Sequence, residues 1–103
     1  MSTTHDLKTW PEPFTAIIEG RKTHEIRRAD RPFAVGDTLH LHEWDPHQVR
    51  QFRTPHGIDC TIVDANPRGY TNRSIKVLVT YLTSGGQWGL PDDLCVMSIE
   101  VTP

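Results

Sequence analysis

The sequence has no apolar run that approaches the roughly 20 residues needed to cross a bilayer. Its polar start, residues 1–6, does not resemble a signal peptide. It contains only two cysteines, Cys60 and Cys95, which stand far apart without a C-x-x-C partner. We therefore expect a cytoplasmic protein with no membrane partner and with two reduced thiols at apolar positions. A disulfide would require the fold to bring the two cysteines together.

The sequence also lacks an excess of positive charge, since 11 Lys and Arg face 13 Asp and Glu, for a net charge of −2. Any nucleic-acid binding must therefore come from a local patch. Phosphate-binding loops, dinucleotide fingerprints and G-x-S-x-G nucleophile motifs are absent. Of the six histidines, His40 and His42 share a predicted strand face, and His24 is a candidate to lie across from them. Because no H-E-x-x-H spacing occurs, we expect no metal site and no cofactor.

A chain of 103 residues is expected to form one domain, residues 1–103. One helix is predicted over residues 11–20, where Phe14, Ile17 and Ile18 form a narrow apolar stripe and Gly20 suits the position past its end. Strands are predicted at residues 22–28, 38–44, 58–63, 74–82 and 94–101. Residues 46–72 are predicted to contain a flexible insertion. The pattern indicates an α+β fold, a small β-barrel of five to six strands with one helix at its mouth.

The densest cluster of charge follows the predicted helix, where residues 21–28 hold four cations and one carboxylate. Such a segment faces water, a partner or a lined cleft, because burying it unpaired costs too much. One interpretation is a solvated edge strand in which Glu25 pairs with Arg27 or Lys22. The other is a site for an anion or a base. Lysine there supplies a point charge or a nucleophile, arginine a planar fork, and glutamate an acceptor for a base amine.

The tryptophans Trp10, Trp44 and Trp88 are the next candidates. A tryptophan in a small domain usually belongs to the core, but Trp88 lies in a glycine-rich loop where nothing local requires bulk. It is predicted to stack on a base, with Gln87 beside it to read a base edge. Lys8 and Trp10 precede the helix and are predicted to line the same mouth as Lys22.

Several motifs together resemble the ASCH superfamily of PUA-like domains, and more closely its largely phage-encoded branch of small proteins. The matching segments are HDLKTWP at residues 5–11, G-x-K-x-x-E-x-R at 20–27, F-x-V-G-D at 33–37, E-W-D at 43–45, V-T-Y at 79–81 and G-G-Q-W-G at 85–89. The resemblance covers most of the chain apart from the excursion around residues 46–72.

This resemblance implies a five- or six-stranded barrel with a cleft at residues 20–27. Members of the superfamily are thought to bind RNA or modified nucleosides; one group hydrolyses N4-acetylcytidine, and at least one member is described as a ribonuclease. In the amidohydrolase group, the lysine matching Lys22 is catalytic, a threonine stands at the position of Glu25, and a later helical segment supplies a glutamate. Only Lys22 carries over. Glu43 is a candidate second acid, or alternatively a strand-end carboxylate at the barrel rim.

The sequence thus predicts a domain that binds RNA, a nucleotide or a modified nucleoside. The predicted ligand-binding residues are Lys8, Trp10, Lys22, Glu25, Arg27, Gln87 and Trp88. The alternative is a hydrolase acting on an N4-acylcytidine-like nucleoside or on RNA, with Lys22 as base or nucleophile and Glu25 and Glu43 handling protons. A third hypothesis is a protein-binding phage accessory factor that kept the barrel and lost the ligand.

Overall fold

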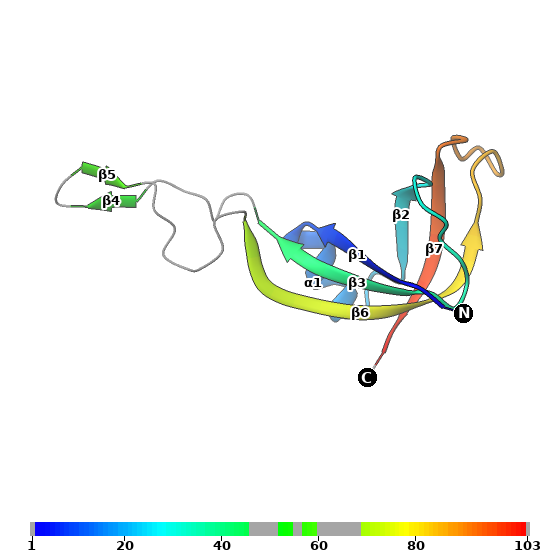
Figure 1. The fold of residues 1–103 in the computed structure, drawn as a ribbon, viewed down its shortest axis with the longest axis horizontal. Helices are drawn as coiled ribbons and strands as arrows, with labels where there is room; N and C mark the ends of the chain where they lie inside the picture. The colour runs from blue at the N-terminus through cyan, green and yellow to red at the C-terminus, as the bar shows by residue number, and fades with distance from the viewer. Residues whose placement is uncertain (1, 46–51, 55–56, 60–68, 103) are drawn as a thin grey trace.

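The computed structural model describes residues 2–45, 52–54, 57–59 and 69–102. Its elements, in chain order, are β1 (Thr4–Thr9), α1 (Pro11–Ile18), β2 (His24–Arg28), β3 (Thr38–Trp44), β4 (Phe52–Thr54), β5 (Gly57–Asp59), β6 (Tyr70–Thr83) and β7 (Leu94–Val101). Five strands form one sheet in the order β1-β3-β6-β7-β2, and β4 pairs with β5 (Figure 1). No helix of the described residues is long and apolar enough to cross a membrane.

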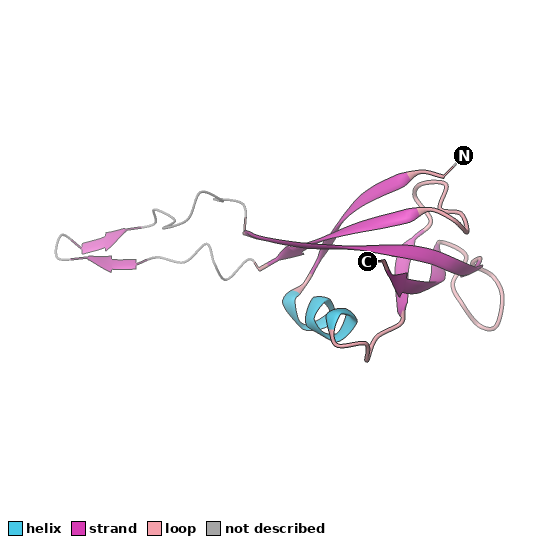
Figure 2. Cartoon of the chain, turned by 90° about the horizontal axis from the view of Figure 1, so that it is seen from below, coloured by secondary structure: helices cyan, strands magenta, loops and turns pink. Residues whose placement is uncertain are grey.

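The five-stranded sheet curls into a half-barrel with the short helix against one face (Figure 2). β1 and β3 are parallel, and every other pair in this sheet is antiparallel. The predicted α+β class and the barrel-like sheet are therefore confirmed. Because β1 and β2 stand at the two ends of the strand order, the curl leaves two edges with no shared ladder among the described strands.

The predicted strands at residues 38–44 and 94–101 are β3 and β7 without change. β6 is longer than predicted, since it begins at Tyr70, inside the segment assigned to an insertion. The rest of that segment contributes β4 and β5, and residues 46–51, 55–56 and 60–68 lie outside the described part of the chain. β1 was not predicted as a strand.

The helix α1 begins with proline in its first turn and ends before Gly20, whose φ of +79° is the left-handed conformation favoured after a helix. Phe14 and Ile17 are buried as the apolar stripe predicts, whereas Ile18 is half exposed. Ile17 packs into a core formed by alternate, inward-facing residues of β1, β3, β6 and β7. The other members of this core are Leu7, Leu39, Leu41, Val77, Val79, Cys95, Met97 and Ile99.

Cys95 is a buried free thiol, and Cys60 lies outside the described residues. Burial raises the pKa of the Cys95 thiol, because the low-dielectric core disfavours the thiolate. This side chain therefore acts as a small apolar residue of the core.

A buried ion pair anchors the start of the sheet. The Nε2 atom of His5 in β1 lies 2.8 Å from Oδ2 of Asp37, which immediately precedes β3. The Asp37 carboxylate also accepts hydrogen bonds from the backbone N–H groups of Thr3 and Ala34 at 3.0 Å each. Burial alone would raise the pKa of Asp37, but the hydrogen bond with the His5 ring, together with those from Thr3 and Ala34, outweighs burial and the pKa is lowered. The pair thus holds β1 in register beside β3.

Candidate functional site

A pocket of about 440 Å³ lies against residues of the two edge strands and of the start of α1. From β1 and the first helical turn it is lined by Lys8, Thr9, Trp10 and Pro13. The segment entering and forming β2 contributes Lys22, His24, Glu25, Ile26 and Arg27. Five of the predicted site residues, Lys8, Trp10, Lys22, Glu25 and Arg27, therefore share one pocket. We refer to it as the edge pocket.

Glu25 is the central carboxylate of the edge pocket and is only 4% exposed. Its Oε1 atom accepts a hydrogen bond of 2.7 Å from Lys22 Nζ, and its Oε2 atom one of 3.0 Å from Arg27 Nε. Lys22 Nζ also donates to the carbonyl oxygen of His24. The sequence interpretation of a solvated edge strand correctly paired Glu25 with Lys22 and Arg27. The structure differs in that the Glu25 side chain is buried. A carboxylate buried this deeply requires such partners, since an unpaired one would be costly.

Arg27 connects the two edges of the half-barrel. It extends from β2, and its terminal guanidinium nitrogen donates to the carbonyl oxygen of Lys8 in β1 at 2.8 Å. The same nitrogen lies 3.4 Å from Oγ1 of Thr9. Side-chain hydrogen bonds thus span the gap that no backbone ladder of the described strands closes.

These contacts leave hydrogen-bond donors available for a ligand. A guanidinium has five N–H donors and an ammonium three. Within the described residues, Arg27 Nε and one terminal nitrogen are engaged, which leaves the other terminal nitrogen. Lys22 uses donors toward Glu25 and His24, and among the same residues it has one left. With Lys8 on the opposite edge, the pocket carries three cations and one carboxylate, so an anionic group is favoured there.

The local sequence explains how Lys22 reaches the pocket. The backbone N–H groups of Arg21 and Lys22 both donate to the carbonyl oxygen of Ala16, closing the end of α1. This places Lys22 at the negative end of the helix dipole, which favours a cation. It also explains why β2 begins at His24 and not at residue 22. Alternation along β2 then turns Glu25 and Arg27 inward, as the sequence predicts, and leaves His24 and Ile26 more exposed.

Aromatic side chains stand beside the cations. Trp10 lines the edge pocket and is 53% exposed, with its ring edge-on to Trp44 at 5.3 Å between centroids. The ammonium of Lys8 lies 4.3 Å from the centroid of the Trp44 ring. Trp10 is therefore a half-exposed aromatic ring at the pocket, the kind of side chain on which a base can stack, and it lies next to a cation held by cation–π attraction.

A family model described as a domain of unknown function (DUF3850) matches residues 4–99. The chain belongs to the DUF3850 family. It is also similar to a protein of Escherichia phage P2, named as an uncharacterized 12.9 kDa protein in the GpA 3′ region, with 43% identity over 44 residues. The match covers 43% of this chain and 40% of the phage protein, so the chain spans less than half the length of that relative.

Two of the predicted ligand-binding residues, Gln87 and Trp88, do not line the edge pocket. They border a different pocket of about 360 Å³ with other residues of the β6–β7 loop. That loop meets the far end of β2, where Arg28 pairs with Leu94, whereas Lys22 precedes the opposite end of the strand. The expectation that all seven residues share one mouth is therefore not met. Trp88 itself is 93% exposed, and its role as a stacking ring stays a prediction.

Glu43, the candidate second acid, lines another pocket of about 450 Å³ that shares Lys8 with the edge pocket. Its Oε1 atom accepts a hydrogen bond of 2.7 Å from Thr71 Oγ1 and lies 3.4 Å from Arg73 Nε. Glu43 is buried, facing inward like Leu41, as strand alternation predicts. Its partners come from β6 and not from the Lys22 and Glu25 pair, so a joint role with that pair is not supported by contact.

Sequence reasoning missed four residues that line the edge pocket, namely Thr9, Pro13, His24 and Ile26. Thr9 could have been found if residues 4–9 had been interpreted as a strand, because alternation then places it on the inward face with Leu7. His24 and Ile26 are exposed residues of β2 that also line the pocket. Nothing in the sequence distinguishes them from exposed strand residues that line no pocket.

Proposed function

We propose that this DUF3850 domain is a PUA-like domain of the ASCH superfamily and binds RNA, a nucleotide or a modified nucleoside in the edge pocket. The observation that carries the proposal is the convergence of Lys8, Lys22 and Arg27 on one pocket in a chain whose net charge is −2. The ASCH-like motif at residues 20–27 supplies most of the charged lining. A pocket of about 440 Å³ also falls within the usual range for small-molecule sites.

Each lining residue has a role that its contacts permit. The free donors of Lys22 and Arg27 bind phosphate, and Trp10 stacks on the base. Glu25 aligns both cations through its two oxygens, and its remaining lone pairs can accept from an exocyclic amine. Because both cations are already oriented by Glu25, little side-chain entropy is lost when a ligand enters.

Binding to the separate variants K22A and R27A tests the proposal. Affinity for a nucleoside monophosphate and for a short single-stranded RNA is measured by titration calorimetry at fixed salt. We expect each variant to bind at least tenfold more weakly than the parent protein. R28A is the matched control, because Arg28 is the next residue of β2, carries the same charge and does not line the edge pocket. Equal losses in all three variants, or no binding by the parent protein, would contradict the proposal.

A second candidate function is hydrolysis of a modified nucleoside or of RNA. It is favoured by the 2.7 Å contact between Lys22 Nζ and Glu25 Oε1, which places a base or nucleophile beside a proton-accepting carboxylate at a pocket. Turnover of an N4-acylated cytidine or of a labelled RNA that is lost in K22A and retained in R28A would support this function. Binding without turnover at high protein concentration would leave the domain as a binding module.

A further inference from the structure

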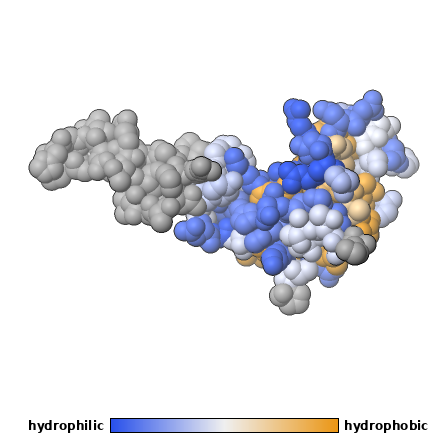
Figure 3. Space-filling model, in the orientation of Figure 1, coloured by the Kyte–Doolittle hydropathy of each residue, from blue (hydrophilic) through white to orange (hydrophobic). Residues whose placement is uncertain are grey.

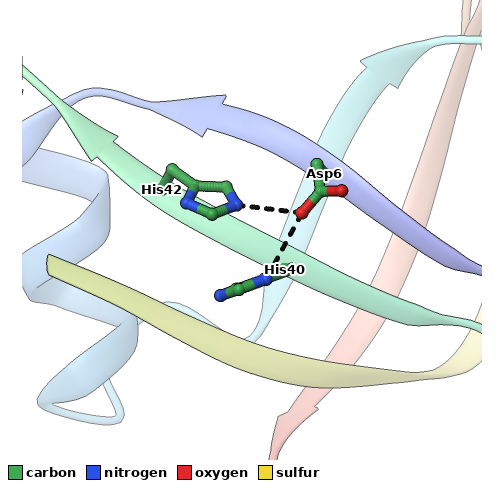
Figure 4. Close-up of side chains that lie close together, drawn as sticks. All are labelled: Asp6, His40 and His42. Atoms are coloured by element: carbon green, nitrogen blue, oxygen red, sulfur yellow. Dashed lines mark hydrogen bonds and ion pairs between the residues drawn. The ribbon is translucent and has the colours of Figure 1, made fainter. Parts of the chain in front are cut away.

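Three side chains that do not line the edge pocket meet on the outward face of β1 and β3, opposite to the core residues of these strands. Asp6 belongs to β1, and His40 and His42 belong to β3 (Figure 4). The parallel register pairs Asp6 with His40 and Lys8 with His42, so the two histidines flank the carboxylate. Potential ligand atoms of the three residues all lie within 4.8 Å of one another. In the view of Figure 3, the surface over these strands is largely hydrophilic.

We propose that Asp6, His40 and His42 bind a divalent transition-metal ion of the zinc class. Two imidazoles with one carboxylate form a ligand set that suits such ions and leaves coordination positions open. The proposal concerns a site separate from the edge pocket and does not depend on the function proposed for it.

The distances agree with this assignment. Asp6 Oδ1 lies 2.9 Å from His42 Nε2 and 3.3 Å from His40 Nδ1. A tetrahedral zinc ion with bonds near 2.0 Å separates neighbouring ligand atoms by about 3.3 Å. Both separations from the carboxylate oxygen are close to that value, and the three ligand atoms all lie within 4.8 Å of one another. The carboxylate oxygen that faces these two ring nitrogens can accept N–H hydrogen bonds from the imidazoles, or it can share a cation with their lone pairs.

A hydrogen bond from the neighbouring strand already orients one of the three proposed metal-binding side chains. His40 Nε2 forms a 2.9 Å hydrogen bond with Ser74 Oγ on the adjacent strand β6. In the tautomer whose Nε2–H donates to that oxygen, Nδ1 carries the lone pair and faces Asp6. Metal-binding histidines usually donate their second ring N–H in this way. The sheet register fixes all three strands, so the ligands are positioned without a flexible loop.

An ion at this position would also be accessible. Asp6 and His42 line the pocket of about 450 Å³ that contains Glu43, Tyr70 and Arg73. Water or a small anionic ligand in this pocket can reach the open coordination positions. The site thus differs from a closed structural zinc site, in which four protein ligands surround the ion.

Titration of untagged, full-length protein with Co²⁺ and then with Zn²⁺ tests the proposal. We expect visible d–d absorption to saturate at one Co²⁺ per chain and to be displaced by Zn²⁺. The variants D6N and H42Q should each bind at least tenfold more weakly. H24Q should bind like the parent protein, since His24 lines the edge pocket on the other edge strand.

S74A separates ligation from folding, because Ser74 is exposed and its removal keeps all three ligands. Loss of a second-shell partner typically weakens metal binding about 10- to 100-fold, so an intermediate affinity is expected. Far-UV circular dichroism shows whether each variant folds. Absence of saturable Co²⁺ or Zn²⁺ binding, or equal affinity in the parent, D6N and H42Q proteins, would overturn the proposal.

Discussion

The guanidinium of Arg27 donates a 2.8 Å hydrogen bond to the carbonyl oxygen of Lys8, and the two residues belong to opposite edges of the same sheet. A sheet that curls without closing normally leaves its edges exposed to other strands. Here one side chain joins them, and the same side chain holds Glu25. Arg27 therefore links the buried carboxylate of the candidate pocket to the opposite edge of the half-barrel.

Replacing Arg27 by lysine should separate charge from geometry. R27K keeps the charge but cannot contact Glu25 and Lys8 with a planar fork. We expect a loss of about 1–3 kcal/mol in the free energy of unfolding, because charge-assisted hydrogen bonds are removed. Urea unfolding measures it, with R28K as the control on the same strand. Unfolding midpoints of R27K and R28K that coincide would show that the connection between the edges contributes nothing to stability.

The variant E25Q tests the buried carboxylate. Glutamine retains the shape of Glu25 but leaves Lys22 and Arg27 without their shared counter-charge. We expect destabilisation of about 2 kcal/mol in urea unfolding, and weaker nucleotide binding in titration calorimetry, because the two cations lose the group that orients them. E12Q, which changes an acidic residue of the first turn of α1 outside the pocket lining, is the control. A stability loss no larger than that of E12Q would contradict the assigned role.

Salt dependence should identify the phosphate contacts. For single-stranded RNA, log affinity falls with log salt concentration, and each lost phosphate contact makes this negative slope shallower by about 0.7. K22A and R27A should each show this shallower slope, whereas R28A should keep the parent slope. Fluorescence titrations at several salt concentrations provide the measurement. A change of the same size in R28A would mean that the binding surface is not the edge pocket.

The two exposed tryptophans should respond differently to ligand length. Trp10 lines the edge pocket and Trp88 does not. We expect W10A to weaken binding of both a mononucleotide and a longer RNA, because stacking contributes about 1–3 kcal/mol per base. W88A should leave mononucleotide affinity unchanged and weaken only the longer RNA. A loss of mononucleotide binding in W88A would instead place the base at the β6–β7 loop.

Protonation of Asp37 should contribute to the loss of stability of the protein at acidic pH. Its pKa is lowered in the folded state, so the carboxylate stabilises the fold fully above the unfolded value of about 3.9. That contribution is lost as the pH falls through the lower folded value. D37N should therefore be less stable than the parent protein at pH 7, and the difference should shrink below pH ~4. Urea midpoints collected from neutral to acidic pH measure this convergence, and a constant difference would contradict it.

The sequence predicted the elements whose hydrophobic pattern is regular. β3 alternates Leu39 and Leu41 with polar residues, and a turn signal at residues 45–46 follows it. β1 was not predicted as a strand because its inward face, formed by His5, Leu7 and Thr9, contains a single apolar residue. His5 is buried through its bond to Asp37, and Thr9 lies in contact with Arg27. Tertiary partners that sequence alone does not reveal make that strand possible.

The candidate site was predicted to a similar extent. Strand alternation was enough to place Glu25 and Arg27 on one face. The position of Trp88 was not predictable, because composition does not say which end of β2 a distant loop meets. The cluster of Asp6 with His40 and His42 was missed for the same reason as β1. Without a strand at residues 4–9, no register brings Asp6 beside the histidines.

The pocket wall formed by Arg27 has a consequence for selectivity. Backbone ladders resist widening, because separating two strands breaks a row of hydrogen bonds together. At the edge pocket the described strands β1 and β2 are joined by contacts of one guanidinium, which can rotate aside while every strand of the sheet stays paired. For the binding function that we propose, a rotamer change of Arg27 is therefore expected to let the edge pocket accept ligands of different size without breaking a strand pair.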